Sequence, residues 1–204
     1  MTTVPGPDGK PRCRWCAAAP EFFAYHDGEW GFPQGDDRLL FEKLCLEGFQ
    51  SGLSWRTILA KRENFRRAFH GFDFEKMARM GERDVERLLK DEGIIRHRGK
   101  IEAAINNAKR ATEMVKREGS LAAFLWRHAL PPGSGPSTAA TTPESVALSK
   151  ALKKDGWKFV GPTTVYAFMQ AMGLVNDHVE DCVTRTKAET ARKRFKRPAK
   201  ASAS

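Results

Sequence analysis

The stretch KKDGWKFVGPTTVYAFM, residues 153–169, decides how the fold is read. It joins two segments of helical apolar spacing through a short turn that ends on Gly161, and Pro162 stands where the next helix would begin. Such a glycine lets the backbone approach a ligand, and the first amides of the following helix carry partial positive charge. The stretch predicts an anion site, for which a DNA phosphate is one candidate; a plain connection between helices is the alternative. Three lysines would support the anion site: Lys153, Lys154 and Lys158.

Helical spacing of apolar residues continues along most of the chain. Four polar residues stand where helices would begin, and each is a good N-cap: Asp36 or Asp37, Ser54, Asp73 and Ser120. The segment AYHDGEWGFP, residues 24–33, fits neither a helix nor a strand, and residues 130–144 form a loop rich in Pro, Gly, Ser and Thr. No stretch has the features of a convincing strand, so the sequence predicts an all-α fold.

Length and composition favour one globular domain. The chain has 204 residues, of which 41% are hydrophobic and 29% charged, enough for one good-sized core. We expect a disordered segment over residues 1–12, a single domain of two helical lobes over 13–184, and a basic disordered tail over 185–204. No apolar run reaches the ~18 residues of a membrane-spanning helix, and no signal peptide is visible, so we expect a cytoplasmic protein.

The net charge of +10 is concentrated at the C-terminal end. Residues 183–204 contain eight lysines and arginines and one acid, Glu189, so this segment carries +7 of the total. A basic end of this kind is typical of a solvated tail. It would add a non-specific attraction to phosphates that weakens with salt, and it does not by itself indicate a sequence-specific DNA reader.

Cysteines and histidines suggest a metal site. In a reducing compartment the four cysteines, at 13, 16, 45 and 182, are metal ligands or buried thiols rather than disulfides. His178 and Cys182 are four apart, so on a helical turn they point the same way. Cys13 and His26 are an available second pair, and four protein ligands would make a structural zinc site without an open position.

Two other readings of these residues remain open. Cys13 and Cys16 form a C-x-x-C segment that could bind a metal itself, with a second pair supplied from near residue 180. Alternatively, the histidines are isolated buried side chains and the thiols are inert.

Glu47 has two readings as well. It lies at the edge of an apolar helical face with Leu40 and Leu44, four residues after Lys43. A surface Lys43–Glu47 pair would contribute only a few tenths of a kcal/mol. A carboxylate beside aromatic side chains could instead accept a hydrogen bond from the exocyclic amine of a purine.

Six segments, in order from Cys13 to Cys182, together resemble the 3-methyladenine DNA glycosylase I family of constitutive bacterial enzymes: RCRWC, AYHDGEWGFP, LFEKLCLEGFQSGLSW, GIIRHRGKI, ALSKALKKDGWKFVGPTT and GLVNDHVEDC. The resemblance implies a helix-hairpin-helix glycosylase fold with its hairpin at 155–161. It also implies an enzyme that flips N3-methyladenine out of double-stranded DNA and hydrolyses its N-glycosidic bond, leaving an abasic site. We assume a monomer.

The same resemblance assigns residues to roles. The ligands of one structural Zn²⁺ would be Cys13, His26, His178 and Cys182, with Cys16 as a bystander. The base pocket would be formed by Glu47, Tyr25 and Trp55, surrounded by Trp15, Phe22 and Trp30. Contacts to DNA would come from the loop that probes the gap left by the extruded nucleotide and from the hairpin: Gly52, Leu53, Lys158, Gly161 and Thr163. Tyr25 would then line the pocket while its neighbour His26 binds the metal.

The chain departs from the family pattern at Phe22, where the family usually has Tyr. Phe159 stands where the wider superfamily has Gly, as it does in this family. Asp177 lies in the region of the superfamily's catalytic Asp, but it adjoins the expected ligand His178, so we do not expect it to be the catalytic base. Asp27 and Glu29 either hold the His26 ring or bond to the backbone.

Two alternative functions stay open at this stage. One is a zinc-stabilised DNA-binding module without catalysis, which the hairpin, the metal ligands and the basic tail would also suit. The other is a glycosylase of the same fold with a different lesion preference.

Overall fold

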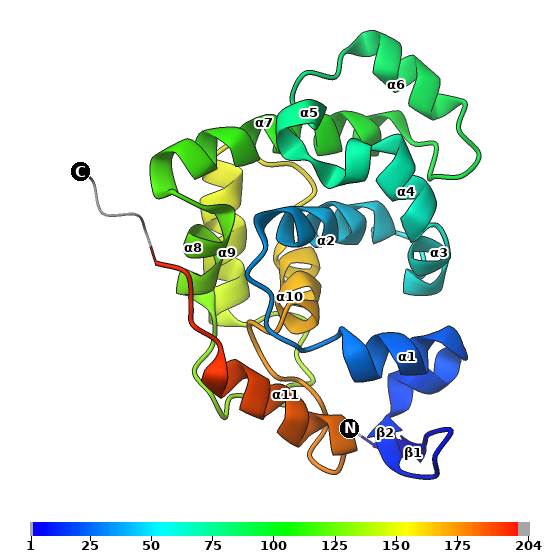
Figure 1. Ribbon diagram of the computed structural model, residues 1–204, viewed down its shortest axis with the longest axis vertical. Helices are drawn as coiled ribbons and strands as arrows, with labels where there is room; N and C mark the ends of the chain where they lie inside the picture. Colours follow the sequence, from blue (N-terminus) through cyan, green and yellow to red (C-terminus); the bar gives the residue numbers. More distant parts are fainter. Residues whose placement is uncertain (1, 200–204) are drawn as a thin grey trace.

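The computed structural model describes residues 2–199 and is built mainly of helices (Figure 1). The predicted all-α fold is confirmed, with one small antiparallel hairpin of strands, β1 (Thr3–Pro5) and β2 (Pro11–Cys13), added at the N-terminal end. Within the described residues, none of the helices combines the length and the apolar character needed to cross a membrane. The helices are α1 (Glu21–Gly28), α2 (Asp37–Gln50), α3 (Trp55–Ala60), α4 (Arg62–Ala68), α5 (Phe74–Met77), α6 (Glu82–Leu89), α7 (Arg98–Glu118), α8 (Leu121–Leu125), α9 (Pro143–Lys154), α10 (Pro162–Ala171) and α11 (Val183–Arg194), with short 3-10 helices η1 (Arg14–Ala18), η2 (His70–Phe72) and η3 (Trp126–His128).

Helix α2 lies at the centre of the fold and packs against α3, α7, α8 and α10. Its predicted N-cap is observed, because the Asp36 side chain accepts a hydrogen bond from the Leu39 backbone amide at 2.9 Å. Leu40 and Leu44 are fully buried on this helix, as the apolar spacing predicts. The other three predicted caps, Ser54, Asp73 and Ser120, begin α3, α5 and α8 in the same way.

The predicted turn between α9 and α10 is held by buried side chains of neighbouring helices. Asn107 of α7 makes two hydrogen bonds with the backbone of Lys158: its Oδ1 accepts from the amide at 2.8 Å, and its Nδ2 donates to the carbonyl at 2.9 Å. Ser149 of α9 donates to the Val160 carbonyl at 2.6 Å. Between these anchors, Phe159 adopts a left-handed conformation with φ of 55° and is partly exposed. The turn therefore presents an ordered tip.

The expectation that residues 24–33 avoid regular structure is wrong in its first half. Helix α1 covers residues up to Gly28, and only the remainder turns back irregularly. Phe22, Tyr25 and His26 are spaced three and four apart, so one face of a helix buries all three. Burial of that face overrides the mixed polar composition of the segment.

Both ends of the chain contain structure where disorder was expected, so these two expectations are wrong in part. Residues 3–5 and 11–13 pair as strands, and the segment after Cys182 forms α11, which packs against β2 (Figure 1). Arg192 explains the order of α11. Its buried guanidinium donates to the backbone carbonyls of Gly173, Leu130 and Leu174 at 2.8, 2.9 and 3.1 Å. Residues 1 and 200–204 lie outside the described residues, and the division into one domain with two lobes stays a prediction.

We expect Asn107→Ala to lower the free energy of unfolding by about 1–3 kcal/mol, because both Lys158 backbone groups lose their partner. Chemical denaturation measures this effect. Asn106→Ala is the matched control, since Asn106, also on α7 but more exposed, donates to the Gly156 carbonyl of the same turn at 2.9 Å. Equal losses in the two variants would contradict the assigned role of Asn107.

Candidate active site and metal cluster

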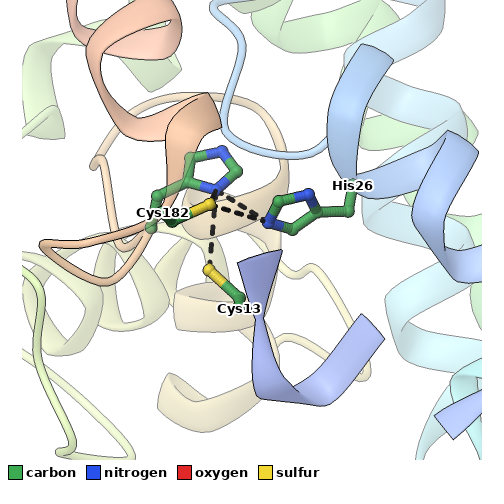
Figure 2. A group of neighbouring side chains, drawn as sticks. Cys13, His26 and Cys182 are labelled. Carbon is green, nitrogen blue, oxygen red and sulfur yellow. Dashed lines mark hydrogen bonds between the residues drawn. The ribbon is translucent and has the colours of Figure 1, made fainter. Parts of the chain in front are cut away.

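Four buried side chains from both ends of the chain meet at one point: Cys13, His26, His178 and Cys182 (Figure 2). Their ligand atoms all lie within 4.8 Å of one another. The nearest pairs are His26 Nε2 to His178 Nδ1 at 3.0 Å, His26 Nε2 to Cys182 Sγ at 3.5 Å, and Cys13 Sγ to His178 Nδ1 at 3.7 Å. The structure thus brings together the four residues predicted as ligands, from β2, α1 and the chain that leads into α11.

The separations, from 3.0 Å up to 4.8 Å, bracket those expected around a four-coordinate metal ion. A tetrahedral ion with bonds of about 2.0–2.1 Å to nitrogen and about 2.3 Å to sulfur places its ligand atoms roughly 3.3–3.8 Å apart. Two imidazoles and two thiols are also the donor set that favours such an ion. The cluster can therefore hold a metal that joins the two ends of the chain.

The hydrogen bonds around the two imidazoles also indicate a cation. His178 Nε2 lies 3.0 Å from the Trp30 carbonyl, which only accepts, so this nitrogen carries the ring proton. His26 Nδ1 lies 2.7 Å from the Asp27 carboxylate and donates to it for the same reason. When both rings are neutral, the remaining nitrogens, His26 Nε2 and His178 Nδ1, face each other with lone pairs. A cation between them removes this repulsion.

Asp27 holds the His26 ring, which is the first of the two roles expected for it. Its carboxylate also accepts from Arg12 at 2.9 Å and from Thr184 at 3.2 Å, and the hydrogen bond from Arg12 helps to keep its pKa below the usual value against the effect of burial. Glu29 does neither of the things expected of it. It forms an ion pair with Arg62 at 2.5 Å instead, because its side chain points away from the cluster toward α4.

The geometry of the C-terminal ligand pair differs from the prediction. Residues 178–182 form an irregular turn before α11 rather than a helical turn, and the Cys182 amide bonds to the Val179 carbonyl at 3.0 Å. The turn still directs His178 and Cys182 to the same point. Gly31 is required beside it, since a Cβ atom there would lie 2.8 Å from His178 Nε2.

The cluster thiols differ from Cys16, the other cysteine of the C-x-x-C segment. Cys182 has its pKa held far below the usual value, chiefly by a hydrogen bond from the Cys13 thiol, which favours the thiolate that binds metals. Cys16 is outside the cluster and donates to the Cys13 carbonyl at 2.8 Å, so it is a bystander. The C-x-x-C reading is therefore wrong.

A cavity of about 480 Å³ lies next to the metal cluster, and we call it the aromatic cavity. Five of the six residues predicted for a base pocket line it: Trp15, Tyr25, Trp30, Glu47 and Trp55. Phe22 is not a lining residue. It packs behind Trp15, with ring centroids 5.8 Å apart, so it supports the cavity from outside. Gln50, Gln170 and Asp177 line the cavity too, and the two glutamines were not predicted as site residues.

Aromatic contacts connect the cavity to the metal cluster. The Trp15 ring lies 5.4 Å from His26 and 5.1 Å from Trp30, and the Trp30 ring lies 4.7 Å from His178. These indoles therefore contact a metal ligand on one side and the cavity on the other. Within the described part of the chain, the buried indole nitrogens of Trp15 and Trp55 have no hydrogen-bond partner, so a ligand with acceptor atoms would suit this cavity.

Glu47 and Lys43 form a buried ion pair, so the reading of a surface pair is wrong. The Lys43 ammonium lies 2.9 Å from Glu47 Oε1, and both side chains are 6% exposed. It also donates to the Tyr25 hydroxyl at 2.6 Å and lies 3.3 Å from the centre of the Trp55 ring. Burial lowers the pKa of Lys43, while the Glu47 carboxylate opposes that effect. The sequence showed the spacing of the pair but not that α1 and α3 would cover it.

Asp177 accepts hydrogen bonds on both carboxylate oxygens, and the expectation that it is not a catalytic base stays a prediction. One carboxylate oxygen accepts from the Tyr166 hydroxyl at 2.5 Å and from Gln170 at 2.8 Å. The other accepts from the Ser137 amide at 3.3 Å. These three hydrogen bonds fix the orientation of the Asp177 carboxylate at the cavity wall.

Comparison with known proteins matches residues 15–186 to the family described as methyladenine glycosylase. The chain belongs to this family. The DNA-3-methyladenine glycosylase 1 of Escherichia coli K12 is 52% identical over 177 residues, covering 84% of this chain and 95% of that protein. The DNA-3-methyladenine glycosylase of Haemophilus influenzae is 48% identical over 181 residues, covering 86% and 98%.

Solved structures of methyladenine glycosylases have the same fold. A crystal structure of 3-methyladenine DNA glycosylase I superposes with a TM-score of 0.79 at 52% identity, covering 84% of this chain and 98% of that one. A Tyr-to-Phe variant of such an enzyme, in complex with 3-methyladenine, superposes with a TM-score of 0.80 at 36% identity, covering 85% and 97%. The recognised family and its glycosylase fold are thereby confirmed.

In this methyladenine glycosylase the residues predicted to contact DNA lie on exposed turns. Gly52 has a φ of 76° in the turn after α2, and Leu53 beside it is 43% exposed, an unusual position for a large apolar side chain. Lys158 and Thr163 are exposed on either side of Gly161, around which the space is open. Their contacts with DNA stay a prediction.

We expect Asp27→Ala to weaken metal binding by about 10- to 100-fold, because His26 loses the acceptor that orients its ring. Competition against a chelator measures the affinity. Glu29→Ala is the matched control, since Glu29 bonds to Arg62 and not to a ligand. If both variants bind metal as the unmodified protein does, the role of Asp27 is refuted.

Proposed function

We propose that the protein is a DNA repair glycosylase that excises N3-methyladenine by hydrolysing its N-glycosidic bond. The observation that carries the proposal is the aromatic cavity with a single buried ion-paired carboxylate, Glu47, facing Tyr25 and Trp55. A related enzyme has been solved with 3-methyladenine bound, which supports the same ligand here.

The chemistry suits a site without a strong proton donor. Methylation at the third ring nitrogen gives the base a positive charge and weakens the bond between the sugar carbon and the base. When this bond breaks, its electron pair stays with the base, which leaves neutral, while the sugar becomes an oxocarbenium ion. A water oxygen then bonds to the sugar carbon and loses a proton, leaving an abasic site. The cavity has to bind the extruded base and hold it in place.

Recognition would come from the aromatic rings and the carboxylate together. Tyr25 and Trp55, whose ring centroids lie 5.5 Å apart, can stack on a cationic base, an attraction of roughly 0.5–2 kcal/mol. Glu47 would accept a hydrogen bond from the exocyclic amine, strengthened by its charge. Guanine has an acceptor at that position, so the site would reject it. Trp15 and Trp30 complete the enclosure.

The substrate would be double-stranded DNA carrying alkylated adenine. The amides at the start of α10, next to Gly161, would bind a phosphate with the help of Lys158 and Thr163. Gly52 and Leu53 would fill the gap left by the extruded nucleotide. The helix-hairpin-helix would thus hold the backbone while the turn after α2 keeps the duplex open, and one chain supplies every part, so we propose a monomer.

The metal we propose is one structural Zn²⁺. The donor set of two thiols and two imidazoles favours zinc, and four protein ligands leave no position for substrate or water. Zinc would fix β2 and α1 to the segment before α11, and so position Trp15 and Trp30. Unpaired buried cysteines agree with a reducing compartment, and we propose that the protein acts in the cytoplasm.

We expect Glu47→Gln to lower kcat/KM for release of 3-methyladenine from methylated DNA by about tenfold or more, because a charge-assisted hydrogen bond contributes roughly 1.5–3 kcal/mol. Chromatography of the released bases measures the rate. Glu42→Gln is the matched control, a buried acid of the same helix that pairs with Arg66 and does not line the aromatic cavity. Unchanged rates for Glu47→Gln would show that the Glu47 carboxylate does not recognise the base. DNA binding without any release by the unmodified protein would favour the non-catalytic module, and release of other bases would indicate a different lesion range.

We expect Cys182→Ser to lose the metal and to melt at a lower temperature, because a structural zinc contributes folding free energy. Metal content and thermal unfolding followed by circular dichroism measure the two effects. Cys45→Ser is the control, since Cys45 is a buried thiol outside the cluster. A Cys182→Ser protein that is metal-free and equally stable would exclude a structural role.

A further inference from the structure

Lys43 contacts three members of the aromatic cavity from behind. Its ammonium is the only described cation paired with Glu47, and it also reaches the Tyr25 hydroxyl and one face of Trp55. Yet Lys43 does not line the aromatic cavity. It lines a second cavity of about 390 Å³, and Tyr25 and Trp55 line both, so these two rings form the partition between the cavities. Lys43 therefore acts on a bound base only through its neighbours.

The charges around this partition balance in pairs. Lys43 from α2 is the counter-ion of Glu47 on the same helix. Arg62 from α4 is the other nearby cation, and it is paired with Glu29 beyond the end of α1. Arg66 is paired with Glu42 in the same second cavity. Of the two carboxylates that line the aromatic cavity, Asp177 accepts hydrogen bonds from neutral groups, whereas Glu47 has a cation at 2.9 Å.

This balance matters because the base changes charge during the reaction proposed above. The base is cationic before the bond breaks and neutral after it. A carboxylate without a counter-ion would attract the cationic base more strongly than the departing neutral base. Since only interactions that are stronger in the transition state accelerate a reaction, that extra attraction would oppose catalysis.

We propose that Lys43 is a positioning residue that offsets the charge of Glu47, so that the cavity fits the base as it becomes neutral rather than the cationic base of the ground state. The inference rests on the proposed glycosylase function. The same ammonium also orients three side chains of the cavity, those of Glu47, Tyr25 and Trp55.

A purely structural role for Lys43 has different kinetics. If Lys43 only kept the cavity in shape, its loss would weaken binding and raise KM. If it offsets charge, its loss strengthens binding of the cationic substrate and slows the chemical step, so KM and kcat fall together.

The test is Lys43→Met, which keeps the length of the side chain and removes its charge. We expect KM for lesions in methylated DNA to fall severalfold and kcat to fall about tenfold. In a Glu47→Gln background there is no carboxylate to offset, so the same substitution should no longer lower kcat. Lys43→Gln serves in the same way if Lys43→Met does not fold. Lys61→Met is the matched control, because Lys61 donates to the Glu92 carbonyl on the surface.

Several outcomes would overturn the proposal. They are a rise of KM at constant kcat, an equal loss of kcat with and without the carboxylate, and kinetics like those of Lys61→Met. Failure of the function itself is seen separately, because the unmodified protein would then release no 3-methyladenine at all. Release by the unmodified protein with unchanged kinetics in Lys43→Met refutes only the role of Lys43.

Discussion

The approach of two imidazole nitrogens, one from each end of the chain, to 3.0 Å is the constraint on which this structure depends. His26 and His178 come from opposite ends of the chain, and each has its proton directed outward, to Asp27 and to the Trp30 carbonyl. Without a cation this arrangement is repulsive, and with one it joins both termini. The aromatic cavity is built on that junction, because Trp15 and Trp30 contact the imidazoles directly. A change in how the cluster binds a metal would therefore also change the shape of the cavity.

The sequence alone predicted the elements whose signals are local. Cap residues such as Asp36 act within one helical turn, so the start of α2 could be predicted. Gly161 followed by Pro162 is typical of a turn before a helix, so the start of α10 could be predicted as well. The four residues of the cluster were candidates because few residue types bind zinc, but it was the family resemblance that selected them over Cys16. What the sequence could not show depends on contacts between distant segments. Arg192 orders α11 through carbonyls of other loops, and Lys43 is buried only because α1 and α3 cover it.

The turn between α9 and α10 is coupled to the cavity through α2. Gly48 follows Glu47 on this helix, and a Cβ atom at that glycine would lie 3.3 Å from the side chain of Phe159. The absence of a side chain at Gly48 lets the tip of the turn pack next to the residue that would read the base. A DNA backbone bound at the turn would thus lie close to the helix that carries Glu47.

Burial decides what the carboxylate of this cavity can do. A buried carboxylate with no counter-ion is costly, and such a group attracts the nearest available cation, which in this cavity would be the cationic base itself. An ion pair on one helix avoids that cost while leaving the second carboxylate oxygen available. The same pair limits how strongly a cationic base is bound before the bond breaks. Recognition of a charged lesion and release of a neutral base make opposite demands on one site, and a buried Lys43–Glu47 pair meets both because the attraction it offers is directional rather than a net charge.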